Sequence, residues 1–374
     1  MTSPGSTTFC VSTAARFNHM DLLARTAELV AIPSVSHQEG ALADHVESML
    51  RSRTSLDVTR IGANVVGRSQ LGRARRVVFA GHLDTVPANG NEVPRPDGDT
   101  LWGLGSADMK GGLAVMLEVA AALSEPAVDV TFAFYAGEEV AREHSGLLAI
   151  DAVSPDLLRG DAAVLGEPTC ARIEAGCQGV LKLDIELGGE RAHTARPWMG
   201  INAVHRLSPI LTTLANYEAR QPVIDGCGYR EALQAVAVHA GVAGNVVPDR
   251  ATLTLNHRFA PDRTAPEAEA AVRELFNPVL DPARGDQLRV IEAQPAAAPA
   301  LTHPVLAALV AATTAPARGK LGWTDVAFFA ERGIPAVNFG PGDPELAHTA
   351  GERVDRAELE RAYAIIVKLL SAPL

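Results

Sequence analysis

Two adjacent glutamates follow a Gly at the end of an apolar run. They are Glu138 and Glu139 in "TFAFYAGEEVAREHSG" (131–146). Side chains alternate along a strand, so neighbours at its end point in opposite directions. Two anions this close repel each other unless a cation or solvent separates them. One glutamate can then bind a metal while the other faces a bound water. The alternative is a solvated pair of charges in a loop.

Three further motifs and a late loop carry similar groups. In "FAGHLDTVP", His82 and Asp84 share one face of an extended segment, where one group can ligate a metal and the other orient it. Asp108 precedes a helical pattern in "WGLGSADMKGG", whose glycines allow close backbone approach. A plain helix N-cap is the alternative for this Asp. Glu167 ends the apolar run in "LGEPT", and His348 stands in the loop "ELAHTA".

Together these side chains predict a site for two metal ions. The candidate ligands are His82, Asp108, Glu139, Glu167 and His348. Most of them end predicted parallel strands, the edge at which open α/β sheets bind ligands. Two His and three carboxylates suit two zinc ions with one His each and a bridging carboxylate, and cobalt or manganese as substitutes. Zinc ions roughly 3.5–4 Å apart could share a hydroxide and polarise a carbonyl. Glu138 would then be the general base that passes a proton to a leaving amine.

The elements that must position these residues follow an α/β pattern. Near-continuous apolar runs predict strands of a mostly parallel central sheet covered on both faces: 76–81, 130–137, 162–167 and 335–340. Helical patterns alternate with them: 41–53, 109–124 and 356–370. This alternation predicts an α/β doubly wound domain.

The middle of the chain has a different pattern. Alternating segments predict strands at 181–189, 232–241, 250–260 and 288–294, and helical patterns cover 201–219 and 265–276. The order β-α-β-β-α-β is typical of a ferredoxin-like α+β unit. We therefore expect an inserted domain at 179–292 within a catalytic domain of residues 20–178 and 293–374, with residues 293–301 as the returning connection. The polar segment 1–19 is expected to be a disordered extension.

Composition narrows the class of protein further. The chain has 374 residues, enough for a large domain plus a second one, and a formal charge of -11. An acidic chain without a long basic run argues against nucleic acid as the main partner, but not against an anionic small substrate. The four cysteines lack C-x-x-C spacing and predict reduced thiols of a cytoplasmic protein. Membrane association is not expected, because every apolar stretch is shorter than a membrane span.

Five spaced motifs carry a family resemblance: "GHLDTVP", "GLGSADMKGG", "YAGEE", "LGEPT" and "AHTAGERV". In this order, and from about Met20 onward, the chain resembles the dinuclear zinc aminoacylase and deacylase family of metallopeptidases. The resemblance implies a zinc-dependent exopeptidase-like catalytic domain and a small N-acyl amino acid as substrate. It also implies that the inserted domain is a lid that forms a homodimer.

The resemblance also implies roles for individual residues. The ligands of the two zinc ions would be His82, Asp108, Glu139, Glu167 and His348. Asp108 would bridge the two ions and Asp84 would orient His82. Glu138 would be the general base.

Within the family, "GWTDVAFFAERGIPAVNFGPGDPELAHTA" resembles an actinobacterial branch. That branch hydrolyses N-succinyl-LL-2,6-diaminopimelate to succinate and LL-2,6-diaminopimelate, on the bacterial route to lysine and cell wall. The likeness implies that His193 reaches the partner subunit's site and stabilises the oxyanion. It implies that Asn245, Arg258 and Thr324 contact the substrate.

One position departs from the better-studied proteobacterial branch. That branch has "NGRRGS", with a substrate-binding Arg, where this chain reads "AGCQGV", so Cys177 stands at the position of the Arg. We hypothesise that Arg196, in "AHTARPW", supplies the lost carboxylate contact. Two alternatives stay open: an acetylornithine deacetylase or other N-acyl-amino-acid deacylase of the same family, and a non-catalytic metal or peptide binder.

Overall fold

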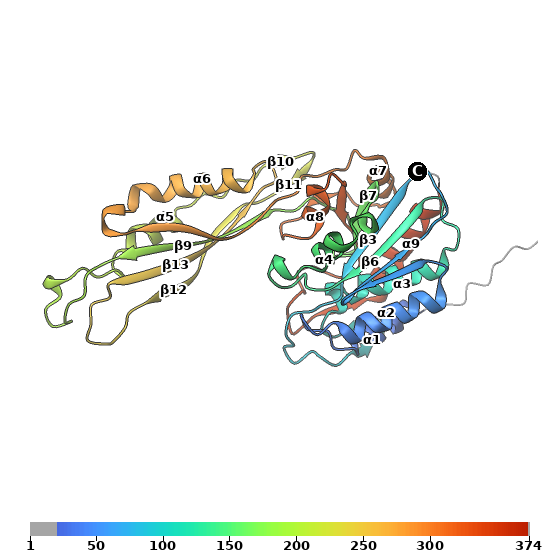
Figure 1. Ribbon diagram of the computed structural model, residues 1–374, viewed down its shortest axis with the longest axis horizontal. Helices are drawn as coiled ribbons and strands as arrows, with labels where there is room; N and C mark the ends of the chain where they lie inside the picture. The colour runs from blue at the N-terminus through green and yellow to red at the C-terminus, as the bar shows by residue number, and fades with distance from the viewer. Residues whose placement is uncertain (1–20, 373–374) are drawn as a thin grey trace, which may run out of the picture.

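The protein consists of a main body and an elongated lid (Figure 1). The computed structural model describes residues 21–372, so the extension expected at residues 1–19 lies outside the described part. The chain builds most of the main body first, leaves it at β9 (Gly179–Gly188), and returns after β14 (Gln287–Gln294). The elements from β9 to β14 are called the lid below.

The main body is built on an eight-stranded sheet with the order β1-β2-β6-β3-β7-β16-β8-β15. Four central strands are parallel neighbours: β6 (Asp129–Tyr135), β3 (Arg76–His82), β7 (Ala162–Leu165) and β16 (Ala336–Asn338). These four are the strands that the apolar runs predict. The sequence patterns did not predict the two outer strands on each side of the sheet: β1 (Asp57–Ile61), β2 (Asn64–Arg68), β8 (Glu174–Ala175) and β15 (Arg318–Gly319).

Helices cover both faces of this sheet, as its fully buried strands require. Along β3, Val77 and Phe79 face one core while Val78 and Ala80 face the other, because side chains alternate along a strand. The helices of the first core are α1 (Leu22–Val30), α2 (Gly40–Arg53), α3 (Gly111–Ala122), α7 (Pro304–Ala312) and α9 (Arg356–Ser371). Those of the second are α4 (Gly146–Val153) and α8 (Val326–Glu331). The result is the mixed α/β fold expected from the sequence.

The lid is a four-stranded antiparallel sheet with the order β12-β13-β9-β14. Its elements follow one another as β9, α5 (Leu207–Ala215), β12 (Ala232–Ala240), β13 (Arg250–Phe259), α6 (Ala265–Phe276) and β14. The alternate residues Leu183 and Ile185 of β9 pack against Ile210 of α5 and Val272 of α6. The remaining face of the sheet is left without helices (Figure 1). This is the β-α-β-β-α-β order that the sequence pattern indicates.

Two helices are shorter than the sequence patterns predict. The pattern at 109–124 predicts a helix that in the structure begins only at Gly111. Asp108 (φ -118°, ψ 93°) and Met109 have non-helical backbone angles, so the helix cannot begin earlier. The pattern at 201–219 yields only α5, which begins at Leu207. Pro209 fits the first turn of a helix, where its missing N–H costs nothing, and disfavours an earlier start.

Small strands outside the two main sheets were not predicted. A three-stranded sheet joins β17 (Arg353–Asp355), β5 (Thr100–Trp102) and β4 (Arg95–Asp97). A two-stranded ribbon joins β10 (Val223–Ile224) and β11 (Cys227–Gly228). Strands of two or three residues are too short to show a period of two in the sequence.

Three of the four cysteines lie in the described part of the chain. Cys170, Cys177 and Cys227 are free thiols, and Cys10 lies outside the described residues. Between residues 21 and 372, every helix is too short or too polar to cross a membrane.

A buried ion pair fastens one corner of the lid. The Asp286 carboxylate is fully buried and accepts hydrogen bonds from both terminal nitrogens of Arg206, at 2.7 and 2.6 Å. It also accepts from the backbone N–H groups of Gly188 at 3.1 Å and Asp281 at 2.8 Å. Burial opposes ionisation of Asp286, but the bonds from Arg206 and the two amides outweigh it and lower the pKa. The end of β9 and the start of β14 are therefore held by one charged group.

Replacing this carboxylate should loosen the lid. Asp286→Ala leaves Arg206 and two amides without their partner, so we expect the free energy of unfolding of the lid to fall by about 3 kcal/mol. Hydrogen exchange of the β9 amides measures this change. Because the folded-state pKa is depressed, the stabilisation is present above the unfolded pKa, and the difference from the parent should vanish as the pH falls below about 4.

The matched control is the surface pair of the same loop. Arg284 and Asp281 lie 3.2 Å apart, and each side chain is 47% exposed. Arg284→Ala should therefore change stability by less than about 1 kcal/mol. Equal effects of the two substitutions would contradict the assigned role of Asp286.

Candidate metal centre and active site

The ends of three parallel neighbours bring the candidate residues together. His82 ends β3, Glu138 and Glu139 follow β6, and Glu167 follows β7, so all emerge at one edge of the sheet. His348 comes from a loop beyond β16. One cavity is lined by most of the predicted ligands, Asp108, Glu139, Glu167 and His348, together with Glu138. His82 lies beneath it and is 1% exposed.

Asp84 holds two of these strand ends in register. Its carboxylate oxygens accept hydrogen bonds from the backbone N–H groups of Glu138 at 3.1 Å and Glu139 at 3.0 Å. The hydroxyl of Ser36 donates a third bond at 2.8 Å. Burial opposes ionisation, but the attraction of the nearby His82 ring and the bonds from the two amides prevail and lower the pKa of Asp84 to about 2. This charge therefore fixes the backbone of the paired glutamates.

The ring of His82 is oriented for ligation. Its Nδ1 lies 3.0 Å from the backbone oxygen of Asp84, which can only accept, so Nδ1 carries the proton of this bond. The other nitrogen, Nε2, then presents a lone pair and lies 3.1 Å from Oδ1 of Asp108. A lone pair facing a carboxylate oxygen calls for a proton or a metal ion between them.

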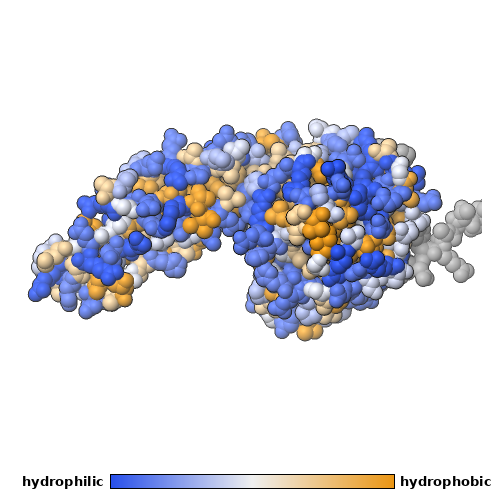
Figure 2. Space-filling view, in the orientation of Figure 1, coloured by the Kyte–Doolittle hydropathy of each residue, from blue (hydrophilic) through white to orange (hydrophobic). Residues whose placement is uncertain are grey.

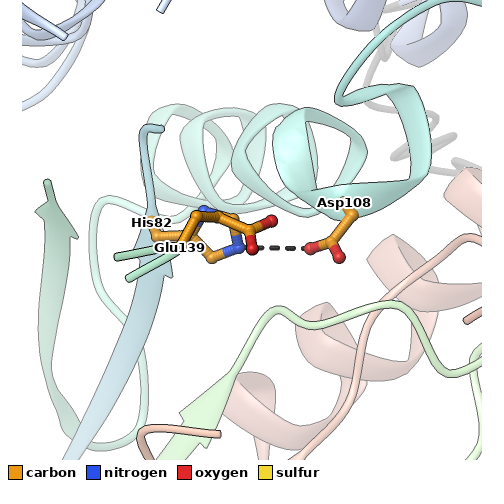
Figure 3. A group of neighbouring side chains, drawn as sticks. All are labelled: His82, Asp108 and Glu139. Carbon is orange, nitrogen blue, oxygen red and sulfur yellow. Dashed lines mark hydrogen bonds and ion pairs between the residues drawn. The ribbon is translucent and has the colours of Figure 1, made fainter. Parts of the chain in front are cut away.

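Asp108 lies between the two histidines. Its Oδ1 faces His82, and its Oδ2 lies 3.5 Å from Nε2 of His348. The same nitrogen of His348 lies 2.9 Å from Oε1 of Glu139. Ligand atoms of His82, Asp108 and Glu139 all lie within 4.8 Å of one another, and Figure 3 shows the two carboxylates beside the imidazole ring. Asp108 is therefore not the N-cap considered from the sequence, since Lys110 precedes α3.

The site concentrates negative charge. Burial, followed by repulsion from Asp108, raises the pKa of Glu167 to about 7. Burial also raises the pKa of Glu138 well above its usual range, with Glu167 and Asp325 adding to the effect. One oxygen of Glu167 is buried without a hydrogen-bond partner among the described residues. Imidazole and carboxylate donors with excess anionic charge fit divalent metal ions.

Two of the predicted substrate contacts lie near this centre. Thr324 lines the same cavity, and its hydroxyl donates to Asn338 Oδ1 at 2.9 Å. Arg258, on β13, lines a second cavity between the main body and the lid, which also reaches Glu138 and Glu139. Cys177 is fully buried, with its thiol 3.7 Å from the backbone oxygen of Thr324.

Three predicted residues lie at the opposite end of the lid. His193, Arg196 and Asn245 are exposed, and the backbone of Thr194 bonds to Asn245. They stand in the loops beyond β9 and between β12 and β13, at the tip of the lid furthest from the main body (Figure 1). The ten residues of β9 alone span about 30 Å. Within one chain these side chains line neither cavity.

Glu352 is a site residue that the sequence reading did not assign. Its Oε1 accepts hydrogen bonds from the backbone N–H groups of Ala107 at 3.1 Å and Asp108 at 3.0 Å. Burial raises its pKa to about 7, against the effect of these bonds. The signal was present in the sequence, because Glu352 belongs to the quoted motif "AHTAGERV".

The fold and this centre define a metal-dependent hydrolase of amide bonds. The chain belongs to Peptidase family M20/M25/M40, which it matches over residues 78–372. The family expected from the sequence motifs is thereby confirmed.

Relatives of known name cover nearly the whole chain. A succinyl-diaminopimelate desuccinylase of Corynebacterium glutamicum is 43% identical over 357 residues, covering 94% of this chain and 96% of the relative. A protein of Mycobacterium tuberculosis that provisionally carries the same name is 48% identical over 351 residues, covering 94% and 98%.

Solved structures with low identity share the fold. An M20 metallo-carboxypeptidase of Sulfolobus solfataricus aligns with a TM-score of 0.75 at 15% identity, covering 94% of this chain and 99% of that one. A dinuclear metal-binding peptidase of Bacillus subtilis aligns with a TM-score of 0.68 at 19% identity, covering 94% and 96%. At these identities the comparison establishes the fold alone.

Removing the Glu352 carboxylate should weaken metal binding. Glu352→Ala leaves the amides of Ala107 and Asp108 without an acceptor, so Asp108 loses its fixed position. We expect metal affinity to fall by about 10- to 100-fold, measured by competition with a coloured chelator. Glu352→Gln keeps an oxygen acceptor and should stay within about threefold of the parent. Full affinity in the Ala variant, or equal losses in both, would contradict this role.

Proposed function

We propose that the protein hydrolyses N-succinyl-LL-2,6-diaminopimelate to succinate and LL-2,6-diaminopimelate, a step of lysine and cell-wall precursor synthesis. The observation that carries this proposal is the position of Asp108. Each of its carboxylate oxygens faces one histidine, and the half-buried Glu138 lines the same cavity. Relatives at 43% and 48% identity carry the name of this activity. Free thiols suit a reducing compartment, so we assign the reaction to the cytoplasm.

The proposed cofactor is a pair of zinc ions, with cobalt or manganese as possible substitutes. His82 and Glu167 would hold one ion, His348 and Glu139 the other, and Asp108 both. When bound, such ions lower the pKa of water and polarise the amide carbonyl. Asp84 would keep His82 in the tautomer that leaves Nε2 free for ligation.

Glu138 is the proposed proton carrier. It lines both cavities, so a substrate placed across their junction lies beside its carboxylate. Its raised pKa suits a group that takes a proton from water and gives it to the departing amine. Arg258 and Thr324, one in each cavity, would contact the two ends of such a substrate.

We further propose that the lid forms a homodimer, with domain limits at 178/179 and 292/293. His193, Asn245 and Arg196 could then reach the centre of a second copy, which they cannot reach in their own chain. The strand β12 ends the lid sheet and offers unpaired backbone groups. Apolar patches lie on the surface of the lid (Figure 2). Its exposed apolar side chains include Trp198, Met199, Val223, Val236, Val238 and Val242. An exposed edge strand with apolar side chains favours pairing with a symmetric copy.

Amine release tests the proposed reaction. Zinc-loaded protein should release amine from N-succinyl-LL-2,6-diaminopimelate much faster than from N-acetylornithine, as measured with ninhydrin. Glu138→Gln should lower kcat by about 10²- to 10⁴-fold, because the proton carrier is lost while the shape is kept. Preference for the acetylated compound would instead identify an acetylornithine deacetylase. Metal binding without turnover of either compound would support a non-catalytic binder.

Mixing two inactive variants tests the dimer. Glu138→Gln and His193→Ala should each be nearly inactive alone. After subunit exchange at equal amounts, one intact centre should form in each mixed dimer, and about a quarter of the parent activity should return. Absence of recovery in a mixture that sediments as dimers would exclude His193 from the second copy's site.

A further inference from the structure

A cluster of three charges, two of them buried, lies in the wall of the first cavity. Glu174, on β8, accepts a hydrogen bond from Arg318 Nε at 2.8 Å and pairs with the ammonium of Lys320, also at 2.8 Å. Arg318 and Lys320 follow one another at alternate positions on and just after the paired strand β15. All three side chains line the cavity that holds the candidate metal ligands.

This cluster carries an excess positive charge. Two cations share one anion, and each oxygen of Glu174 already faces a cation, Oε1 facing Arg318 and Oε2 facing Lys320. A cation therefore already stands against each oxygen of Glu174, which disfavours a ligand ammonium at this carboxylate. Arg318 uses its Nε for Glu174, so its terminal nitrogens can serve a ligand. The cluster therefore suits an anion and not a zwitterion.

Its position relative to the metal centre limits what the anion can be. The ammonium of Lys320 lies 3.4 Å from the backbone oxygen of Pro168, the residue after Glu167. Lys320 is 8% exposed and forms the inner part of the cluster, whereas the Arg318 side chain is 46% exposed and forms its rim. A carboxylate joined to the reacting carbonyl by a short chain would meet Lys320 first.

We propose that Lys320 and Arg318 bind the terminal carboxylate of the succinyl group and so set the preference for a dicarboxylic acyl chain. This inference rests on the proposed function, because it takes the acyl group from it. Arg258, on the lid side of the second cavity, would then bind the amino-acid half of the substrate. Binding of the acyl carboxylate by Lys320 and Arg318 also explains how the chain manages without an Arg at position 177, where Cys177 is buried and faces the interior.

The test compares two acyl groups on the same amine. N-succinyl- and N-acetyl-LL-2,6-diaminopimelate differ in the acyl carboxylate, so the ratio of their kcat/KM values isolates its recognition. Lys320→Met and Arg318→Gln should each lower kcat/KM for the succinylated substrate by about tenfold or more, and for the acetylated one by less than about threefold. Equal losses on both substrates would overturn the proposal. Arg318→Gln is the safer variant for folding, because its side chain lies at the rim.

Two further variants separate contact from general charge. Arg172 is exposed, lies outside this cavity, and carries the same charge, so Arg172→Gln should leave the ratio unchanged. Arg196→Ala tests the competing hypothesis from the sequence. If it changes the ratio and the cluster variants do not, the acyl carboxylate is bound by the lid tip and our assignment is wrong.

A binding measurement keeps this proposal distinct from the proposed reaction. Calorimetry with succinate and with acetate on the zinc-loaded protein reports the subsite without turnover. We expect succinate to bind more tightly than acetate, and Lys320→Met to remove the difference. If the parent fails to cleave the succinylated substrate yet binds succinate through Lys320, the reaction is wrong and the subsite stands. If Lys320→Met leaves the affinity for succinate unchanged, the proposed subsite is wrong, whichever substrate the protein cleaves.

Discussion

The geometry of the centre depends on the carboxylate of Asp84. It binds the backbone amides of Glu138 and Glu139, which follow β6, and its own backbone oxygen orients His82 at the end of β3. These two strands are parallel neighbours, so a single residue adds a polar tie between two chain segments that also pair in the sheet. The backbone of the paired glutamates is therefore fixed by one anion.

Charge is the second constraint on this edge of the sheet. Glu138, Glu139, Glu167 and Asp108 line one cavity, and burial raises the pKa of two of them, Glu138 and Glu167. Without cations, such a group is stable only if some carboxyls keep their protons. Bound metal ions would remove the repulsion between the carboxylates and let them lose their protons. Metal binding and the protonation of these carboxyls are therefore linked. Lys320 and Arg318, in the wall of the same cavity, supply a smaller local compensation of this charge.

Much of the centre could be predicted from the sequence, because its residues end local patterns. His82, Glu139 and Glu167 each follow an apolar run, and parallel strand ends meet at one edge. Contacts between segments that lie far apart in the sequence have no local sequence pattern that predicts them. Glu352 bonds to an amide 244 residues earlier in the chain. The start of α3 was misjudged because the unusual backbone at Asp108 serves the site and interrupts a helical sequence.

The count of metal ions tests the central claim most directly, because every assigned ligand follows from it. Zinc titrated into the metal-free protein, with stoichiometry read by calorimetry and by elemental analysis, should bind as two ions per chain. Binding should release protons, more near pH 6 than near pH 8, because Glu138 and Glu167 have raised pKa values. Saturation at one ion, or no tight binding, would contradict the account of Asp108 as a bridge between two metal sites.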